Sequence, residues 1–230
     1  MIAGVLLVNK PINWTSFDAV NYIRKIISSN YNLKPKNIKV GHSGTLDPLA
    51  TGLLIILIGK EYTSRASEFI KNDKIYDVSL KLGYRSDSYD LETNLIQVSN
   101  YIPTNDQMNK TINMHVGKIS QLPPIYSAKK IDGKRLYEFA RKNQKPIIKP
   151  QQIEIYWIKK IKYQYPYLEF SVKVSSGTYI RSLVSDIGKT LKTGAVMTKL
   201  ERTRIGEYSL KDSVDIEGLN FEIISENLLT

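Results

Sequence analysis

Apolar and polar residues near the start of the chain fall into short runs that predict strands and one spaced repeat that predicts a helix. The run from Val5 to Val8 predicts a short buried strand. A second run, from Leu53 to Ile58, is apolar and rich in β-branched residues, which is typical of a central strand. Between them, Thr15 or Ser16 can cap a helix after the break at Lys10 to Asn13. The spaced positions of this helix are Phe17, Val20, Ile23 and Ile27.

The later part of the chain shows period-two patterns and one amphipathic repeat. Tyr76 to Leu82 alternates as a half-buried strand does, and Ile153 to Ile161 and Tyr167 to Val174 predict a hairpin that turns at Tyr165-Pro166. Thr178 to Leu191 predicts an amphipathic helix. Its apolar face consists of Ile180, Leu183, Val184, Ile187 and Leu191. Strands separated by single helices predict an α+β fold.

One segment, Gln121 to Pro150, departs from these patterns. It contains a Pro-Pro pair, many basic residues and two tyrosines, so it is predicted to be a surface-exposed insertion with one short helix, Arg135 to Arg141. No internal repeat or low-complexity linker interrupts the chain. At 230 residues, the chain is long enough for one large domain or two small ones.

Composition narrows the class of protein. Lys and Arg outnumber Asp and Glu by 33 to 22, and the net charge of +11 favours a polyanionic partner such as nucleic acid or a membrane surface. The chain has no cysteine, so it forms no disulfide or thiolate metal site, and a cytoplasmic setting is expected by default. Neither apolar run approaches the roughly 20 residues of a membrane span. We expect a soluble protein.

Two residues in the glycine-rich stretch Gly41 to Pro48 are candidates for chemistry. Asp47 has glycines nearby that let the backbone bend and leave a short carboxylate in a concave site. An Asp followed by a Pro, here Asp47-Pro48, is typical of a helix N-cap and the first helical residue. His42 can contact a ligand or satisfy a buried hydrogen bond. The local pattern leaves these alternatives open.

Aromatic and basic residues elsewhere favour RNA. Tyr179 and Arg181 lie at the start of the predicted amphipathic helix, where they can face a base or an anion, or be a core tyrosine and a surface arginine. Tyr76 would ordinarily be a core residue. Fifteen tyrosines in a basic chain nevertheless suit stacking on unpaired bases with phosphate neutralisation.

Known cofactor and metal patterns are missing from the sequence. Gly52 to Lys60 has the wrong glycine spacing for a phosphate-binding loop, and no Ser or Thr follows the lysine. Two histidines without a neighbouring carboxylate cluster do not predict a catalytic metal. We expect neither a cofactor nor a metal.

Five motifs in order resemble the TruB family of tRNA pseudouridine-55 synthases, from about residue 4 to residue 206. The motifs are Lys10-Pro11 to Ser16, Gly41 to Gly52, Leu82-Gly83 to Asp90, Gln121 to Lys129, and Ser176 to Arg181 with Leu200 to Gly206. The second motif, Gly-His-Ser-Gly-Thr-Leu-Asp-Pro-Leu-Ala-Thr-Gly, is nearly diagnostic alone.

The resemblance implies an activity and a set of site residues. It implies isomerisation of uridine 55 in the T loop of tRNA, with Asp47 as the catalytic carboxylate and Arg181 as its ion-pair partner. The residues that would border the uridine are His42, Tyr76, Tyr179 and Leu200, and the Tyr76 phenol could also accept a proton. A mixed, largely antiparallel central sheet is implied as well.

The resemblance also makes residues 121–150 an RNA-gripping thumb, in which Lys129, Lys130 and Lys134 would contact phosphates. The expected partner is the T arm of tRNA, with no membrane and no obligatory protein partner, and the protein is expected to be a monomer. The main alternative is a non-catalytic tRNA-binding or tRNA-folding protein on the same scaffold. An isomerase that acts on another RNA, such as ribosomal RNA, is a more distant one.

Three positions depart from the family pattern. Asn13 stands where Gly is usual, and Asn also enters positive φ at low cost. Ser64 replaces the usual basic residue after Thr63, with Arg65 next. Many relatives carry a second, C-terminal RNA-binding domain, whereas this chain ends soon after Gly206, so the resemblance implies the catalytic domain alone, as a single domain over residues 1–230.

Overall fold

The computed structural model describes residues 1–142, 144 and 146–230, and the chain divides into two compact units. The first unit comprises residues 1–76 and 200–230, and the second comprises residues 77–199. Strands β4 (Lys74–Leu82) and β12 (Ala195–Ile205) run through both units. The expectation of a single domain over residues 1–230 stays a prediction.

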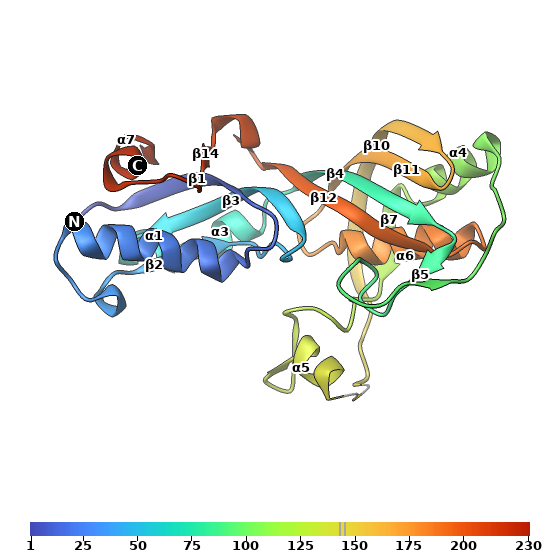
Figure 1. Ribbon diagram of the computed structural model, residues 1–230, viewed down its shortest axis with the longest axis horizontal. Coiled ribbons are helices and arrows are strands. Elements are labelled where there is room, and N and C mark those ends of the chain that lie inside the picture. Colours follow the sequence, from blue (N-terminus) through green and yellow to red (C-terminus); the bar gives the residue numbers. More distant parts are fainter. Residues whose placement is uncertain (143, 145) are drawn as a thin grey trace. The chain divides into compact units, whose positions relative to one another are not determined.

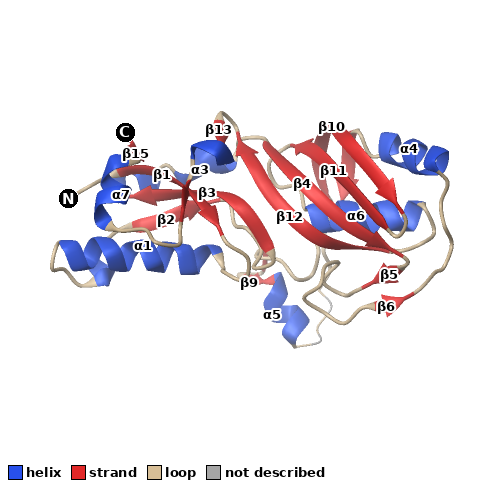
Figure 2. Ribbon diagram, turned by 45° about the horizontal axis from the view of Figure 1, so that its top comes forward, coloured by secondary structure: helices blue, strands red, loops and turns tan. Residues whose placement is uncertain are grey.

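The first unit is built on a sheet whose strand order is β14-β1-β3-β12-β4, with β2 on β3, β13 on β12 and β15 on β1 (Figures 1 and 2). The pairing is mixed, because β1 is antiparallel to β3 whereas β12 runs parallel to β3. The other elements of this unit are β1 (Gly4–Lys10), α1 (Ser16–Asn30), η1 (Pro35–Asn37), β2 (Val40–Ser43), β3 (Ala50–Ile58), α2 (Lys60–Ser64), α3 (Ala66–Ile70), β13 (Tyr208–Ser209), η2 (Leu210–Asp212), β14 (Val214–Asp215), α7 (Phe221–Glu226) and β15 (Leu228–Leu229).

Both faces of β1 and β3 are buried, which explains their uninterrupted apolar sequences. One face forms a core with Phe69 of α3 and Ile205 of β12, and the alternate residues of both strands are equally inaccessible to solvent. Thr15 caps α1 in a capping box with Asp18, so the predicted helix start is confirmed. Phe17, two residues after the cap, was expected among the apolar positions of this helix, but it is 58% exposed and lies outside the buried face of α1.

The second unit has the strand order β12-β4-β11-β10-β7, with α6 against the sheet (Figure 2). The predicted hairpin is confirmed, since β10 pairs antiparallel with β11 from Ile155↔Val174 to Gln164↔Tyr167. The other elements of this unit are β5 (Tyr84–Arg85), β6 (Ile96–Gln97), α4 (Asn105–Met114), β7 (Gly117–Gln121), β8 (Lys130–Ile131), β9 (Lys134–Arg135), α5 (Leu136–Arg141), β10 (Gln151–Gln164), β11 (Tyr167–Val174) and α6 (Ile180–Thr190).

The predicted insertion, residues 121–150, contains the β8–β9 hairpin and α5. Figure 1 shows α5 standing off from the strands of the second unit. Asn143 and Lys145, which fall within this prediction, lie outside the described residues. Helix α5 begins at Leu136, one residue after the predicted start, because Arg135 occupies the N-cap position.

Candidate active site

Asp47 lies on a tight turn between β2 and β3. Its backbone carbonyl accepts a hydrogen bond from the N–H of Ala50 at 3.0 Å, so Asp47 and Pro48 occupy the first two positions of a β-turn. Strand β3, not a helix, follows the turn, and the alternative that Asp47 is a helix N-cap is therefore wrong. The Asp47 residue is half-buried.

Helix α1 and the segment before it hold this turn. The Ser16 hydroxyl accepts from the N–H of Leu46 at 2.8 Å and donates to its carbonyl at 3.2 Å, and both contacts are buried. The Asn13 N–H donates to the carbonyl of Pro48 at 2.8 Å. Asn13 has φ +67, which confirms that it adopts the backbone conformation expected where Gly is usual. The residues on both sides of Asp47 are thus fixed.

Lys10 is a fully buried cation beneath the same turn. Its ammonium donates to the carbonyls of Pro11 at 2.8 Å and Trp14 at 2.7 Å, and more weakly to Pro48 at 3.5 Å. Burial lowers the pKa of Lys10 to about 8, although the negative charge of Asp47 opposes this shift. Three carbonyl acceptors offset part of the cost of burying the charge.

Arg202 is a second fully buried cation that braces the loop. Its Nε donates to the carbonyl of Leu53 at 2.8 Å and its Nη2 to the carbonyl of Gly44 at 2.9 Å. The strand that carries it approaches β3 very closely, since a Cβ on Gly52 would lie 2.5 Å from the carbonyl oxygen of Arg202. Gly52 also has φ +97. Glycine is therefore required there for two reasons.

The other residues expected around the uridine in the first unit are His42, Tyr76 and Leu200. Leu200 pairs with Ala50, directly after the Asp47 turn, and is 7% exposed. Tyr76 is 6% exposed on β4. His42 lies half-buried on β2, and burial, followed by the charge of Arg202, lowers its pKa. Its Nδ1 has no hydrogen-bond partner among the described residues.

Arg181 belongs to the second unit, where its guanidinium is 3% exposed and firmly held. Its Nη1 donates to the carbonyl of Ser88 at 2.9 Å and its Nη2 to that of Tyr126 at 2.7 Å. Its Nε lies 3.5 Å from the Asp90 carboxylate, which is equally buried. The alternative of an ordinary surface arginine is wrong.

Tyr179 occupies the N-cap position of α6 and is half-buried, so the alternative that it is a core tyrosine is not what the structure shows. The side chain of Gln121 brackets its backbone, accepting from the Tyr179 N–H at 2.8 Å and donating to its carbonyl at 3.1 Å. The first residue of the predicted insertion thus fixes the start of α6.

The three lysines predicted to bind RNA differ in their surroundings. Lys130 and Lys134 are exposed on the β8–β9 hairpin. Lys129 is half-buried, and its ammonium donates to the Gln151 side chain at 2.9 Å. Lys130 and Lys134 are therefore better placed to meet phosphates than Lys129.

Sequence reasoning did not single out Lys10, Arg202 or Asp90 as site residues. The available signal was that each lies inside one of the five family motifs. Their partners are backbone carbonyls or a residue far along the chain, and local patterns do not reveal these.

Two negative findings concern the residues that the structure describes. No three of their His, Asp or Glu side chains form a group that could hold a metal ion. Likewise, no helix in this part of the chain is long and apolar enough to cross a membrane.

Comparison with solved structures supports the fold. A chain in an H/ACA ribonucleoprotein bound to a substrate RNA containing 2′-deoxyuridine matches with a TM-score of 0.66 and 25% identity, over 94% of this chain and 52% of that one. A chain in a Cbf5-Nop10-Gar1 complex matches with a TM-score of 0.67 and 28% identity, over 92% and 52%. This chain thus spans 52% of the length of each. The expected pseudouridine synthase fold is confirmed.

Sequence comparison identifies the family. A family model described as TruB family pseudouridylate synthase (N terminal domain) matches residues 30–180, and one described as tRNA pseudouridylate synthase B C-terminal domain matches residues 181–228. The tRNA pseudouridine synthase B of Protochlamydia amoebophila is 41% identical, over 93% of this chain and 78% of that protein. The one of Parabacteroides distasonis is 42% identical, over 99% and 96%. The chain therefore belongs to the TruB family of tRNA pseudouridine synthases, which are isomerases.

Proposed function

We propose that this enzyme isomerises uridine 55 in the T loop of tRNA to pseudouridine, with Asp47 as the catalytic carboxylate. The observation that carries the proposal is the position of Asp47 on a turn held from both sides, with the buried cation Lys10 beneath it. A carboxylate that is fixed in place and flanked by positive charge is suited to act on a reacting centre without reorganising.

The reaction breaks the N1–C1′ glycosidic bond of uridine and joins C5 to C1′, after which C5 loses its proton and N1 gains one, so that product and substrate are isomers. Redox chemistry and hydrolysis play no part, so the reaction itself needs no cofactor. An ionised Asp47 would either attack the nucleoside covalently or assist departure of the base. The uridine must first leave its stack, which costs a few kcal/mol and is easier in a loop than in a duplex.

The family resemblance assigns His42, Tyr76, Tyr179 and Leu200 to the surroundings of the uracil, and Arg181 to the carboxylate. The burial of Tyr76 and Leu200 supports an apolar wall that would keep the detached base from diffusing away. Three hydrogen-bond or ion-pair partners fix the Arg181 guanidinium. The guanidinium would therefore already be oriented when it binds the Asp47 carboxylate.

RNA binding would come from the basic insertion, with Lys130 and Lys134 on its exposed hairpin and Lys129 in a supporting position. The target loop of tRNA offers single-stranded bases and a flanking stem whose phosphates these lysines would contact. We propose that the T arm supplies most of the recognition and that the enzyme acts as a monomer.

Replacement of Asp47 by Asn tests the catalytic assignment. We expect Asp47→Asn to bind tRNA but to form no pseudouridine, because the amide keeps the shape of the side chain and loses its charge. Asp106→Asn, on the exposed start of α4, is the matched control and should retain activity. Pseudouridine formation above background by Asp47→Asn would refute the assignment.

Chemical mapping of pseudouridine tests the substrate. Total tRNA and ribosomal RNA from cells with and without this protein should differ at position 55 of tRNA. A difference confined to ribosomal RNA would favour the alternative of an isomerase for another RNA. If neither RNA pool differs in its pseudouridine between the two kinds of cell, the result would favour a tRNA-folding role.

A further inference from the structure

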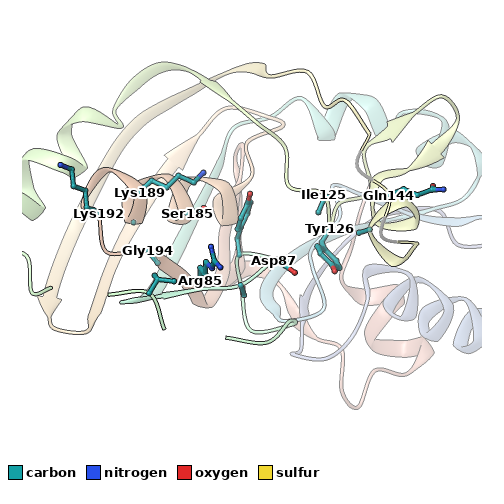
Figure 3. A pocket seen from close by; sticks show the side chains of 15 residues that line it. Arg85, Asp87, Ile125, Tyr126, Gln144, Ser185, Lys189, Lys192 and Gly194 are labelled. Atoms are coloured by element: carbon teal, nitrogen blue, oxygen red, sulfur yellow. The ribbon is translucent and has the colours of Figure 1, made fainter. Parts of the chain in front are cut away.

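The second unit contains a pocket of about 750 Å³ that lies beside α6 and includes none of the residues assigned to the uridine. This volume is within the range of sites that hold small molecules and nucleotides. The pocket carries three cationic side chains, Arg85, Lys189 and Lys192, and a single carboxylate, Asp87. In Figure 3 the three cations lie at one end, Ile125 and Tyr126 lie toward the other, and Asp87 lies between them.

Two residues with a strained backbone conformation line this pocket, and a third, Lys160, lies outside it on β10. The non-glycine residues with positive φ among the described residues are Asn13, Asn32, Tyr89, Asp132, Lys160 and Lys192. Asn and Asp tolerate this conformation, whereas Tyr and Lys pay for it. Tyr89, with φ +65, and Lys192, with φ +59, both line the pocket. Strained backbone positions cluster at binding sites, where the side chain is kept for its function although its backbone conformation is unfavourable.

Neighbouring elements position Tyr89 and Lys192 at the pocket. The carbonyl of Tyr89 accepts from the N–H of Met197 at 2.9 Å, and its ring is half-buried with the Lys189 ammonium 5.8 Å from the ring centroid. Lys192 follows the end of α6, at a position where Gly is usual. Neither Arg85 nor Lys192 has an ion-pair partner within the described part of the chain, whereas the Lys189 ammonium pairs with the Asp186 carboxylate at 2.8 Å on the exposed side of α6.

We propose that this pocket is a second RNA subsite, which takes an unpaired nucleotide of the substrate other than the target uridine. The Tyr89 ring stacks on the base, and Arg85, Lys189 and Lys192 neutralise the phosphates beside it. Base stacking on an aromatic ring combined with lysine and arginine contacts to the backbone is how single-stranded RNA is held. This inference rests on one part of the proposed function, namely that the enzyme binds tRNA.

Substitution by Asn separates binding from packing, because Asn relieves the strain while removing the functional group. We expect Tyr89→Asn and Lys192→Asn to melt no lower than the wild type. Tyr89→Asn should raise the Kd of unmodified tRNA about 5- to 150-fold, the range for loss of one stacked base. Tyr89→Phe, which keeps the ring, should bind as the wild type does.

Lys160→Asn is the matched control for Lys192→Asn. Both changes remove one positive charge at a residue with positive φ, and Lys160 lies on β10 outside the pocket. Lys192→Asn should lower the slope of log K against log salt by about 0.7, the value for one phosphate contact to a single strand. Lys160→Asn should leave that slope unchanged.

Three outcomes would overturn the proposal. The first is a Kd of Tyr89→Asn equal to that of the wild type; if the single-turnover rate at saturating tRNA is then slower, Tyr89 is a positioning residue for its neighbour Asp90. The second is equal salt slopes for Lys192→Asn and Lys160→Asn. The third is tight binding of cytidine 5′-monophosphate that Tyr89→Asn abolishes while tRNA binding holds, which would assign the pocket to a free nucleotide. These readouts are independent of Asp47→Asn, so either proposal can fail alone.

Discussion

Single residues around Asp47 show how buried charge is combined with a fixed backbone. Lys10, Lys74 and Arg202 are at least nine-tenths buried in the first unit, and each donates to two or more backbone carbonyls. Burial, with Arg202 as the next cause, also lowers the pKa of Lys74 to about 8. These cations cost solvation energy. The carbonyls that Lys10 and Arg202 bind belong to the segments that shape the Asp47 loop, whereas Lys74 binds those of Ile70 and Asn72 at the end of α3.

A pH-dependent stability difference follows from Lys10. Its folded pKa of about 8 lies below the ordinary lysine value of 10.5, so the unfolded chain binds more protons between these two values. The cost of burying the charge is fully present below pH 8 and is relieved as the pH rises toward 10.5. Relative to Lys10→Met, the wild type should gain up to about 3 kcal/mol across this window.

Denaturant unfolding of both proteins at pH 7.5 and pH 9.5 measures the part of this gain that falls below pH 9.5. Lys25→Met, at an exposed position of α1, is the control and should differ from the wild type by the same amount at both values. A constant difference between the wild type and Lys10→Met would contradict the expectation.

Gly52 offers a second test at this scale. Gly52→Ala should destabilise the fold by about 1–3 kcal/mol or more, because the added methyl meets the backbone of Arg202 and φ is +97. Gly218→Ala, at φ +82 with open space around its Cβ position, isolates the backbone term and should cost less. Equal melting temperatures for the two variants would show that the close approach carries no energy.

At the scale of elements, the β8–β9 hairpin carries Lys130 and Lys134, two lysines of the insertion whose side chains face solvent. Replacing Lys130 and Lys134 together by Ala should weaken tRNA binding and lower the salt slope by about 1.5, since two phosphate contacts are lost. Lys34→Ala with Lys36→Ala, at η1, removes the same charge elsewhere and should change both quantities less. The measurements are the Kd for tRNA and the single-turnover rate of both double variants. A weaker Kd with an unchanged rate would show that the hairpin binds RNA, whereas a slower rate with an unchanged Kd would show that it contributes to the chemical step.

Elements differed in how far their patterns predicted them. β1, α1, β3, β4, β10, β11 and α6 lie where their apolar periods indicate. Helix α4 was not predicted, although Thr104 and Gln107 form a capping box. Its buried apolar face consists of little more than Met108 and Ile112, which is too few residues to show a helical period. Strand β12 was noticed only as a motif, since buried Arg202 interrupts the apolar alternation that would mark a strand.

At the scale of the whole molecule, the net charge of +11 makes a prediction about binding. The affinity for tRNA should fall linearly in log K against log salt, because each neutralised phosphate releases condensed counterions. The measurement is a Kd series from 50 to 200 mM salt. A flat response would refute an electrostatic grip on RNA.

The sequence alone determined the α+β class, the positions of the main strands and helices, and the family. These rest on local information, namely hydrophobic period, capping residues and contiguous motifs, which the chain order preserves. It also placed Asp47 in a sharply bending segment, but left open whether that segment was a turn or a helix start.

Only the tertiary structure decided what surrounds the candidate residues. Arg202 reaches Gly44 across 158 positions of sequence, and Arg181 reaches Ser88 across 93. Such contacts depend on strand pairing and on close backbone approach, which no local pattern encodes. The pocket with Tyr89 and Lys192 arises in the same way, because α6 and the loop before β6 become neighbours only when the sheet has formed.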